Sequence, residues 1–456
     1  MIKDGKMTDF ILQEYRAKTI KSAGMYKQAC KVMASGVSNN IRYHPPYPCY
    51  FARGKGSRFW DIDGNEYLDF WMGHYCNILG HSPEPIMSAL RENMDIGLHC
   101  GLVTPHQVEL AELICRHIPS AEKVRFCCSG TESTIYALRL ARFYTQRNKI
   151  IKMEGAWHGA ATESTTGNGQ DLLKTKPRLL SPQEAQTIVV PFNDVEMIIQ
   201  AIRKHADDLA AVIVEPIVGK GGFIPANEEY LQTIREETQK VGALLIFDEI
   251  ISAFRLGLGG AQELFGVLPD ITTLGKIIGG GLPIGAIAAR ADILERCSPT
   301  LRKEDRVLIG GGTFSCLPLA MMAGTVLIKH LERNKDQIYP SLERKGDWTR
   351  KSIEKAFAAH GIDARCSGIG SLFMTHFPLR QDIELISPNQ AYFHCDVQRR
   401  EVELKIRLLD RGVFVMHGGG AISIAHSWDD LNIFIERMGE VAHEMQACSS
   451  KYREVG

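Results

Sequence analysis

Six short apolar runs between residues 124 and 288 dominate the middle of the chain. Most are rich in β-branched residues and do not alternate with polar ones, as expected for parallel strands covered on both faces. Helix-like stretches separate several of them, for example Thr131–Arg147 and Glu228–Val241. The pattern predicts an α/β fold with a mainly parallel sheet. The six predicted strands are Val124–Cys128, Ile150–Met153, Thr187–Val190, Ala210–Val214, Ala243–Phe247 and Ile284–Ala288.

The two ends of the chain carry shorter, mixed elements. Ile11–Val32 is predicted to be helical, and Arg58–Asp61 and Glu66–Phe70 flank an Asp-Gly-Asn turn that predicts a hairpin. A helix-like stretch runs from Pro318 to about His330, and a C-terminal helix is predicted near Asp429–Cys448.

Length and composition narrow the class of protein. A chain of 456 residues is too long for one core, so we expect two domains. Lys plus Arg equals Asp plus Glu at 53 each, so no net basic field favours nucleic acid or an anionic membrane. The start lacks the apolar core of a signal peptide, and the 12 cysteines show no metal-type spacing. We expect a cytoplasmic protein with reduced thiols, no metal, and neither a nucleic-acid nor a membrane partner.

An acidic pair and a lysine are the first candidates for chemistry. Asp248 follows a predicted strand, and Lys276 lies between Gly275 and the run Gly279–Gly281. A lysine amine can bind the aldehyde of pyridoxal phosphate (PLP) as a Schiff base, while a carboxylate keeps the pyridine nitrogen protonated. Most strand-end aspartates are caps and most lysines are solvated, so the pair needs support from other segments.

A candidate phosphate site follows the strand Val124–Cys128. Ser129, Gly130 and Thr131 open a predicted helix, and free N–H groups at a helix start bind phosphate well. Gly130 permits close backbone approach, and either hydroxyl can add a hydrogen bond. Ser129 and Glu132 also have the spacing of a simple capping box, which explains the same residues without a ligand.

Two further strand ends offer suitable side chains. Trp157 could stack on a flat cofactor, and His158 could contact the cofactor or the substrate, although a tryptophan there could equally belong to the core. Glu215 ends another strand and should lie at the same sheet edge as Asp248, where ligands of open α/β sheets collect. Thr313 ends the glycine run 310–312, which could also be only a flexible loop.

The order of these motifs resembles the class III aminotransferases of PLP fold type I. The resemblance is strongest to the branch that holds glutamate-1-semialdehyde aminomutase and the β-amino-acid (β-phenylalanine) aminotransferases, and it runs from about Gly36 to the C-terminal helix. It implies a large PLP-binding domain at 76–328, with a central sheet flanked by helices, and a smaller α+β domain from 1–75 and 329–456. The motifs are Ser-Gly-Thr-Glu at 129–132, Trp-His-Gly at 157–159, Val-Glu-Pro at 214–216, Phe-Asp-Glu at 247–249, Leu-Gly-Lys-Ile-Ile-Gly-Gly-Gly at 274–281 and Gly-Thr-Phe-Ser at 312–315.

The resemblance also implies roles around the cofactor. Lys276 would form the Schiff base and shuttle a proton, and Asp248 would pair with the pyridinium nitrogen. Ile250 and Trp157 would cover the two ring faces, where relatives more often have Tyr or Phe at the second position. The phosphate would be bound by Gly130 and Thr131 of this chain, together with Thr313 of a neighbouring subunit in a homodimer.

The resemblance assigns the substrate side less completely. Arg42 ends the segment Gly-Val-Ser-Asn-Asn-Ile-Arg and stands where relatives hold a substrate carboxylate, which a guanidinium can bind bidentately. His417 lies in the predicted C-terminal substrate loop. Both are expected to bind substrate, although Arg42 could also be a surface charge beside a proline-rich segment.

Departures from the family pattern bear on the reaction. The mobile loop of the aminomutase has no match in 160–182, and its acidic residue near the C-terminal loop is absent from Met416–Gly420. Lys220 replaces an asparagine that relatives place near the cofactor's phenolic oxygen. The sequence therefore favours intermolecular transamination between an amino acid, with a β-amino acid preferred, or an amine and a 2-oxo acid. The aminomutase and a racemase or epimerase remain alternatives, whereas a non-catalytic PLP-binding protein would not need both Lys276 and Asp248.

Overall fold

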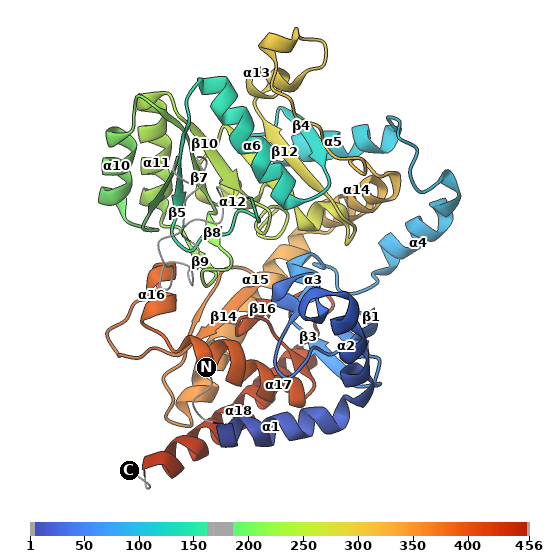
Figure 1. The fold of residues 1–456 in the computed structure, drawn as a ribbon, viewed down its shortest axis with the longest axis vertical. Coiled ribbons are helices and arrows are strands. Elements are labelled where there is room, and N and C mark those ends of the chain that lie inside the picture. Colours follow the sequence, from blue (N-terminus) through green and yellow to red (C-terminus); the bar gives the residue numbers. More distant parts are fainter. Residues whose placement is uncertain (1–4, 162–166, 168–185, 454–456) are drawn as a thin grey trace.

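The computed structural model describes residues 5–161, 167 and 186–453. A seven-stranded sheet forms the upper half of the molecule (Figure 1), in the order β4-β12-β11-β10-β7-β5-β6. The strands from β11 to β6 run parallel, and β12 is antiparallel to both its neighbours. The bounds are β4 Lys123–Cys127, β5 Lys149–Met153, β6 Thr187–Val190, β7 Leu209–Val214, β10 Leu244–Asp248, β11 Ile271–Gly275 and β12 Gly285–Ala289.

The predicted mainly parallel sheet is confirmed, and each of the six predicted strands lies within one residue of its observed bounds. The sequence analysis missed β11. Its five residues include two threonines and end in a glycine, so their apolar content is too low to stand out. All five are nevertheless buried, because β11 lies in the middle of the sheet.

Helices cover both faces of this sheet, which explains why its strands are apolar throughout. Leu244 and Ile246 of β10 pack with α6 (Gly130–Thr145) on one face. Leu245 and Phe247 pack with α10 (Val195–Lys204) and α11 (Glu228–Val241) on the other. Successive side chains of a strand point to opposite faces, so both faces must be apolar.

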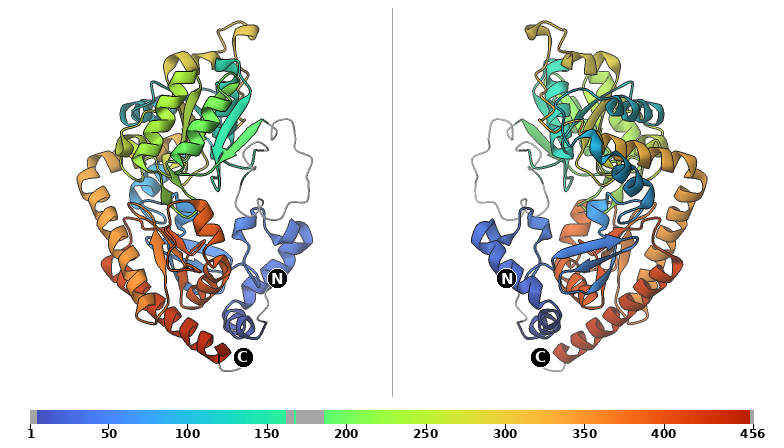
Figure 2. Two further views of the ribbon diagram at one scale, coloured as in Figure 1. Left: turned by 90° about the vertical axis from the view of Figure 1, so that its left-hand side faces the viewer. Right: turned by 90° about the vertical axis from the view of Figure 1, so that its right-hand side faces the viewer.

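The two ends of the chain meet in the lower half of the molecule (Figure 1). The predicted hairpin is confirmed as β2 (Arg58–Asp61) antiparallel to β3 (Glu66–Asp69), and β3 also pairs in parallel with β15 (Val413–Phe414) from the C-terminal part. The long helices α15 (Lys335–Ala358) and α18 (Trp428–Arg453) pack together along the outside (Figure 2).

The remaining elements connect or cover these sheets. No helix of the described ranges is long and apolar enough to cross a membrane. The remaining strands are β1 Phe51–Lys55, β8 Ile217–Val218, β9 Ile224–Pro225, β13 Arg365–Ser367, β14 Leu372–His376 and β16 Gly419–Ala421, and the remaining helices are α1 Gly5–Lys18, α2 Ile20–Val32, α3 Met72–Tyr75, α4 Glu84–Asn93, α5 Pro105–His117, α12 Gly260–Phe265, α13 Ala291–Leu294, α14 Pro318–Arg333, α16 Pro388–Phe393 and α17 Lys405–Asp410.

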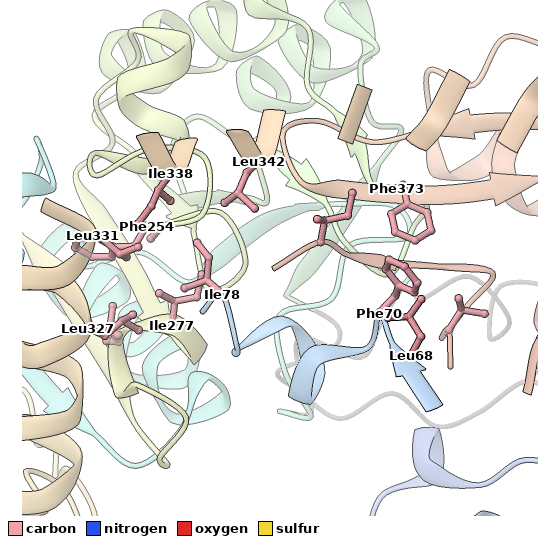
Figure 3. Close-up of a cluster of buried hydrophobic side chains, with 14 of the residues drawn as sticks. Leu68, Phe70, Ile78, Phe254, Ile277, Leu327, Leu331, Ile338, Leu342 and Phe373 are labelled. Carbon is pink, nitrogen blue, oxygen red and sulfur yellow. The ribbon is translucent and has the colours of Figure 1, made fainter. Parts of the chain in front are cut away.

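One hydrophobic cluster joins the two halves (Figure 3). It contains Phe70 from the N-terminal part, Ile277 and Leu327 from the upper half, and Leu342 and Phe373 from the C-terminal part. The residue after Lys276 is therefore anchored in a core shared by both ends of the chain. The domain boundaries at 75 and 328 stay a prediction.

His426 makes the stability of this shared core depend on pH. It stacks on Phe70, and burial lowers its pKa to about 4 from 6.5. In the unfolded chain His426 is therefore protonated below about pH 6.5, whereas in the folded chain it is protonated only below about pH 4. We expect the free energy of unfolding to fall by about 1.4 kcal/mol per pH unit from this group as the pH drops through that window.

Urea unfolding at several pH values measures this dependence. The fall should be shallower in His426→Gln than in the wild type, whereas a variant of the exposed His394, His394→Gln, should keep the wild-type slope. Equal slopes in all three proteins would contradict the assignment.

Candidate functional site

Asp248 stands at the centre of the polar residues at the carboxyl edge of the sheet. It ends β10 and is buried. One carboxylate oxygen accepts a hydrogen bond from the backbone N–H of Ile250 at 3.2 Å, and the other lies 2.8 Å from Nδ1 of His158. The two contacts fix the orientation of the carboxylate.

His158 holds the carboxylate of Asp248 through a hydrogen bond. It is 1% exposed, and burial lowers its pKa although the Asp248 contact opposes the shift. The neutral ring donates from Nδ1 to Asp248, and no described residue hydrogen-bonds its buried Nε2. The sequence left open whether His158 contacts cofactor or substrate; the structure places it against Asp248.

Glu215 adds a second carboxyl group at the same edge, as its position at the end of a strand predicted. Its oxygens accept hydrogen bonds from the backbone N–H groups of Trp157 at 2.9 Å and Gly219 at 3.3 Å. Burial, and next the charge of Asp248, raise the pKa of Glu215 to about 8. At neutral pH Glu215 therefore keeps its proton.

Lys276 immediately follows β11, the neighbour of β10. Its φ of 48° places a non-glycine residue in the left-handed region, at the start of the tight helical turn Lys276–Gly279. Burial lowers the pKa of Lys276, while Cys76, Asp248 and Glu215 oppose the shift. A lysine with a lowered pKa can act as a nucleophile and a base near neutral pH.

Glycines bring the predicted phosphate residues close to the other segments. A Cβ on Gly130 would lie 2.7 Å from Cδ1 of Ile250, and a Cβ on Gly159 would lie 2.6 Å from Oγ1 of Thr131. The Ser129 hydroxyl accepts from the N–H of Glu132 at 3.2 Å, so its capping role is confirmed. Thr131 follows directly at the N-terminal end of α6, where backbone N–H groups favour an anion.

Trp157 lies at the mouth of this region rather than in the core. Its side chain is 40% exposed, and Nζ of Lys220 lies 4.6 Å from the ring centroid. This cation–π contact is the observed environment of Lys220. The stretch 160–182, where the sequence departs from the family loop, lies largely outside the described residues.

His74, which was not predicted as a site residue, lies near His417: the ring of Trp71 is 4.3 Å from that of His74 and 6.5 Å from that of His417. Burial, and then the charges of Arg42, Lys276 and His417, lower the pKa of His74 to about 4. The turn α3, which carries His74, packs against the helical turn that begins at Lys276. The available signal was Trp71-Met-Gly-His74 directly after a predicted strand, a pattern like the one that drew attention to Trp157.

Thr313 is not among these residues. Its side chain is exposed, while the preceding Gly311 N–H donates to the hydroxyl of Tyr136 on α6 at 3.2 Å. The expectation that Thr313 reaches a neighbouring subunit stays a prediction.

An amine, a carboxylate, a helix start opened by a glycine and an exposed aromatic ring meet at one sheet edge, which is a site that fits PLP. Residues 40–428 match the family model described as aminotransferase class-III. The chain therefore belongs to the class-III aminotransferases, which are PLP-dependent enzymes.

Curated relatives carry one recurring name. The chain is 37% identical over 424 residues to glutamate-1-semialdehyde 2,1-aminomutase of Thermodesulfovibrio yellowstonii, covering 91% of this chain and 96% of the relative. It is 38% identical over 423 residues to the enzyme of that name from Methanosarcina acetivorans, covering 91% and 97%.

Solved structures share the whole fold. An ω-transaminase from Sphaerobacter thermophilus has a TM-score of 0.85 and 32% identity, covering 93% of this chain and 98% of that one. The β-phenylalanine aminotransferase from Variovorax paradoxus has a TM-score of 0.84 and 28% identity, covering 96% and 97%. The predicted PLP fold type I is thereby confirmed.

Replacing Asp248 by Asn tests the carboxylate. The amide keeps the shape and can still accept from His158, but it lacks the charge. We expect turnover to fall about 100-fold, the size typical of losing one preorganised electrostatic group. Steady-state kinetics at equal cofactor content, measured from the absorption of bound PLP, gives the comparison.

Glu249→Gln is the matched control. Glu249 is buried beside Asp248 but accepts from Ser252 and Gln262 in the core, so its loss should lower stability and not the turnover of folded protein. Equal losses of turnover in both variants would contradict a special role for Asp248.

Proposed function

We propose that this chain is an aminomutase, which exchanges the amino and oxo groups within one carboxylate-bearing substrate, glutamate-1-semialdehyde. The similarity to the curated aminomutases over more than nine-tenths of the chain carries this proposal. The sequence favoured transamination between two molecules, and these relatives support its alternative more strongly.

The residues of the site divide the work between cofactor and substrate. When bound, PLP supplies an aldehyde that takes up amines and a ring that accepts electrons. Lys276 would hold the aldehyde and, once released, move a proton at the substrate carbon that bears the amino group. Asp248 would hold the ring nitrogen protonated, and the N–H groups at Gly130 and Thr131 would bind the phosphate.

Arg42 and His417 are assigned to substrate binding. Arg42 would bind the carboxylate, because a guanidinium offers paired donors to two oxygens. His417 and His74 both lie beside the ring of Trp71, and α3, which carries His74, packs against the turn that begins at Lys276, which supports a substrate site next to the reactive amine. Trp157 and Ile250 would enclose the ring of the cofactor.

Intermolecular transamination is the second candidate. The acidic residue that the aminomutase carries near its C-terminal loop has no counterpart in Met416–Gly420. The similarity to the ω-transaminase of Sphaerobacter thermophilus, with a TM-score of 0.85, supports this candidate as well.

A homodimer is supported by an exposed apolar surface around Thr313. Leu308 and Phe314 flank it at 78% and 62% exposure, and Phe314 lies beside His99, whose neighbour Leu98 is also exposed. Exposed apolar residues gathered on one surface mark protein contacts. The cytoplasmic location stays a prediction.

Incubation with glutamate-1-semialdehyde and no 2-oxo acid tests the proposal. We expect 5-amino-4-oxopentanoate to accumulate, because an internal exchange needs no second acceptor. Chromatography with mass detection measures the product, and Lys276→Ala is the inactive control.

Other outcomes discriminate the alternatives. Turnover of amino donors only when a 2-oxo acid is added would establish transamination instead, and loss of chirality in one amino acid would establish a racemase. A Lys276→Ala protein with full turnover would contradict the assigned role of the lysine.

A further inference from the structure

Glu401 and His417 form a hydrogen-bonded pair at the substrate side of the site. Nδ1 of His417 lies 2.7 Å from Oε2 of Glu401, and the guanidinium of Arg400 donates to the other carboxylate oxygen at 2.9 Å. Burial alone would raise the pKa of Glu401, but His417 and Arg400 hold it at about 2. The carboxylate is therefore permanently ionised and orients the imidazole through Nδ1.

The other nitrogen of His417 is available to a ligand. Nε2 is buried, and no described residue hydrogen-bonds it. An imidazole anchored by a carboxylate on one nitrogen presents the second nitrogen in a fixed direction.

The backbone of His417 is held in an unfavourable conformation. Its φ of 56° is unfavourable for a residue with a side chain, and it is followed by Gly418 at 74°. A Cβ on Gly418 would lie 2.3 Å from Cγ of Arg400, so the loop lies tightly against the segment that carries Glu401. Residues held in such conformations cluster at functional sites.

Glu401 itself comes from an irregular helix. Arg399–Leu404 is a π-helical segment directly before α17. Extra residues in a helical turn of this kind are frequent at functional sites, because they redirect one side chain without ending the helix. Glu403 in the same segment pairs with Arg407 instead, at 3.0 Å.

A second strained turn faces His417 across Trp71. The ring of Trp71 lies 6.5 Å from His417 and 4.3 Å from His74. Met72, Gly73, His74 and Tyr75 all have positive φ, between 44° and 69°. This left-handed turn carries His74, whose Nε2 also lacks a partner among the described residues, and it packs against the helical turn that begins at Lys276.

We propose that His417, positioned by Glu401, binds the carboxylate of the substrate through Nε2 and so determines the preference for carboxylate-bearing amino compounds. The proposal rests on the proposed function, whose substrate it defines more closely. The substrate carboxylate would accept from Nε2, while Nδ1 stays hydrogen-bonded to Glu401. Arg42 would then share the carboxylate with His417, and Glu401 is a positioning residue that does not touch the substrate.

Two variants remove the contact between Glu401 and His417 without disturbing the backbone. Glu401→Gln keeps the shape and loses the charge, and His417→Asn keeps a residue that tolerates positive φ. We expect the KM for glutamate-1-semialdehyde, or for whichever amino acid is accepted, to rise tenfold or more, with kcat changed by less than about threefold. Glu403→Gln, a matched charge removal two residues along the same segment, should leave KM within about twofold.

Calorimetry with glutarate tests the same site without turnover. The wild-type holoenzyme and Glu403→Gln should bind glutarate alike, and Glu401→Gln and His417→Asn should bind it at least tenfold more weakly. A carboxylate-free donor should show no such difference; reaction rates with propylamine, compared with those of 4-aminobutyrate, provide that readout.

The outcomes separate this inference from the proposed function. Equal glutarate affinities in all four proteins, or no measurable binding by the wild type, would overturn it. Loss of kcat with unchanged KM would overturn it too, because it would indicate a structural or chemical role. An absence of turnover with every donor would refute the proposed function alone, since glutarate binding does not depend on it.

Discussion

The structure depends on accommodating charge at the buried edge of its central sheet. Asp248, Glu215, His158 and Lys276 all lie there, and an isolated buried charge would be costly. Three of the four limit this cost: Asp248 accepts two hydrogen bonds, His158 stays neutral and Glu215 keeps its proton.

The sheet explains why these groups meet. Asp248 at the end of β10 pairs in register with Thr273 of the neighbouring strand β11. Lys276 follows Thr273 by three residues, so it lies close to Asp248. The next residue, Glu249, points away from the site and accepts from Ala261, Gln262 and Ser252. The two residues of the acidic pair therefore face opposite sides, Asp248 toward the candidate site and Glu249 toward the core, as the alternation of side chains along a strand requires.

The cofactor side could be predicted from the sequence because it follows from regular elements. Strand ends, a helix start and glycines place Asp248, Glu215 and Gly130 at one edge once the sheet is parallel. The substrate side could not be predicted in the same way. Glu401 lies 16 residues before His417 and meets it through an irregular helix, and the left-handed turn at His74 has little local signature beyond Gly73. The sequence also left open what His158 contacts. Its hydrogen-bond partner, Asp248, follows a different strand, and the residues next to His158 do not reveal it.

The two strained segments on the substrate side can persist because each is fixed to the same core residue. The N–H of Phe70 donates to the carbonyl of Phe414 at 2.9 Å, and its carbonyl accepts from Ala421 at 2.8 Å. Phe70 directly precedes Trp71 and the left-handed turn, while 414 and 421 bracket the loop of His417. A Cβ on Gly420 would lie 2.5 Å from Phe70, so glycine is needed for this approach. Because Phe70 is fully buried, the packing of the shared core offsets backbone strain of about 1–3 kcal/mol per residue in both segments. The two strained segments are thus supported by the same hydrophobic cluster that anchors Ile277 beside Lys276.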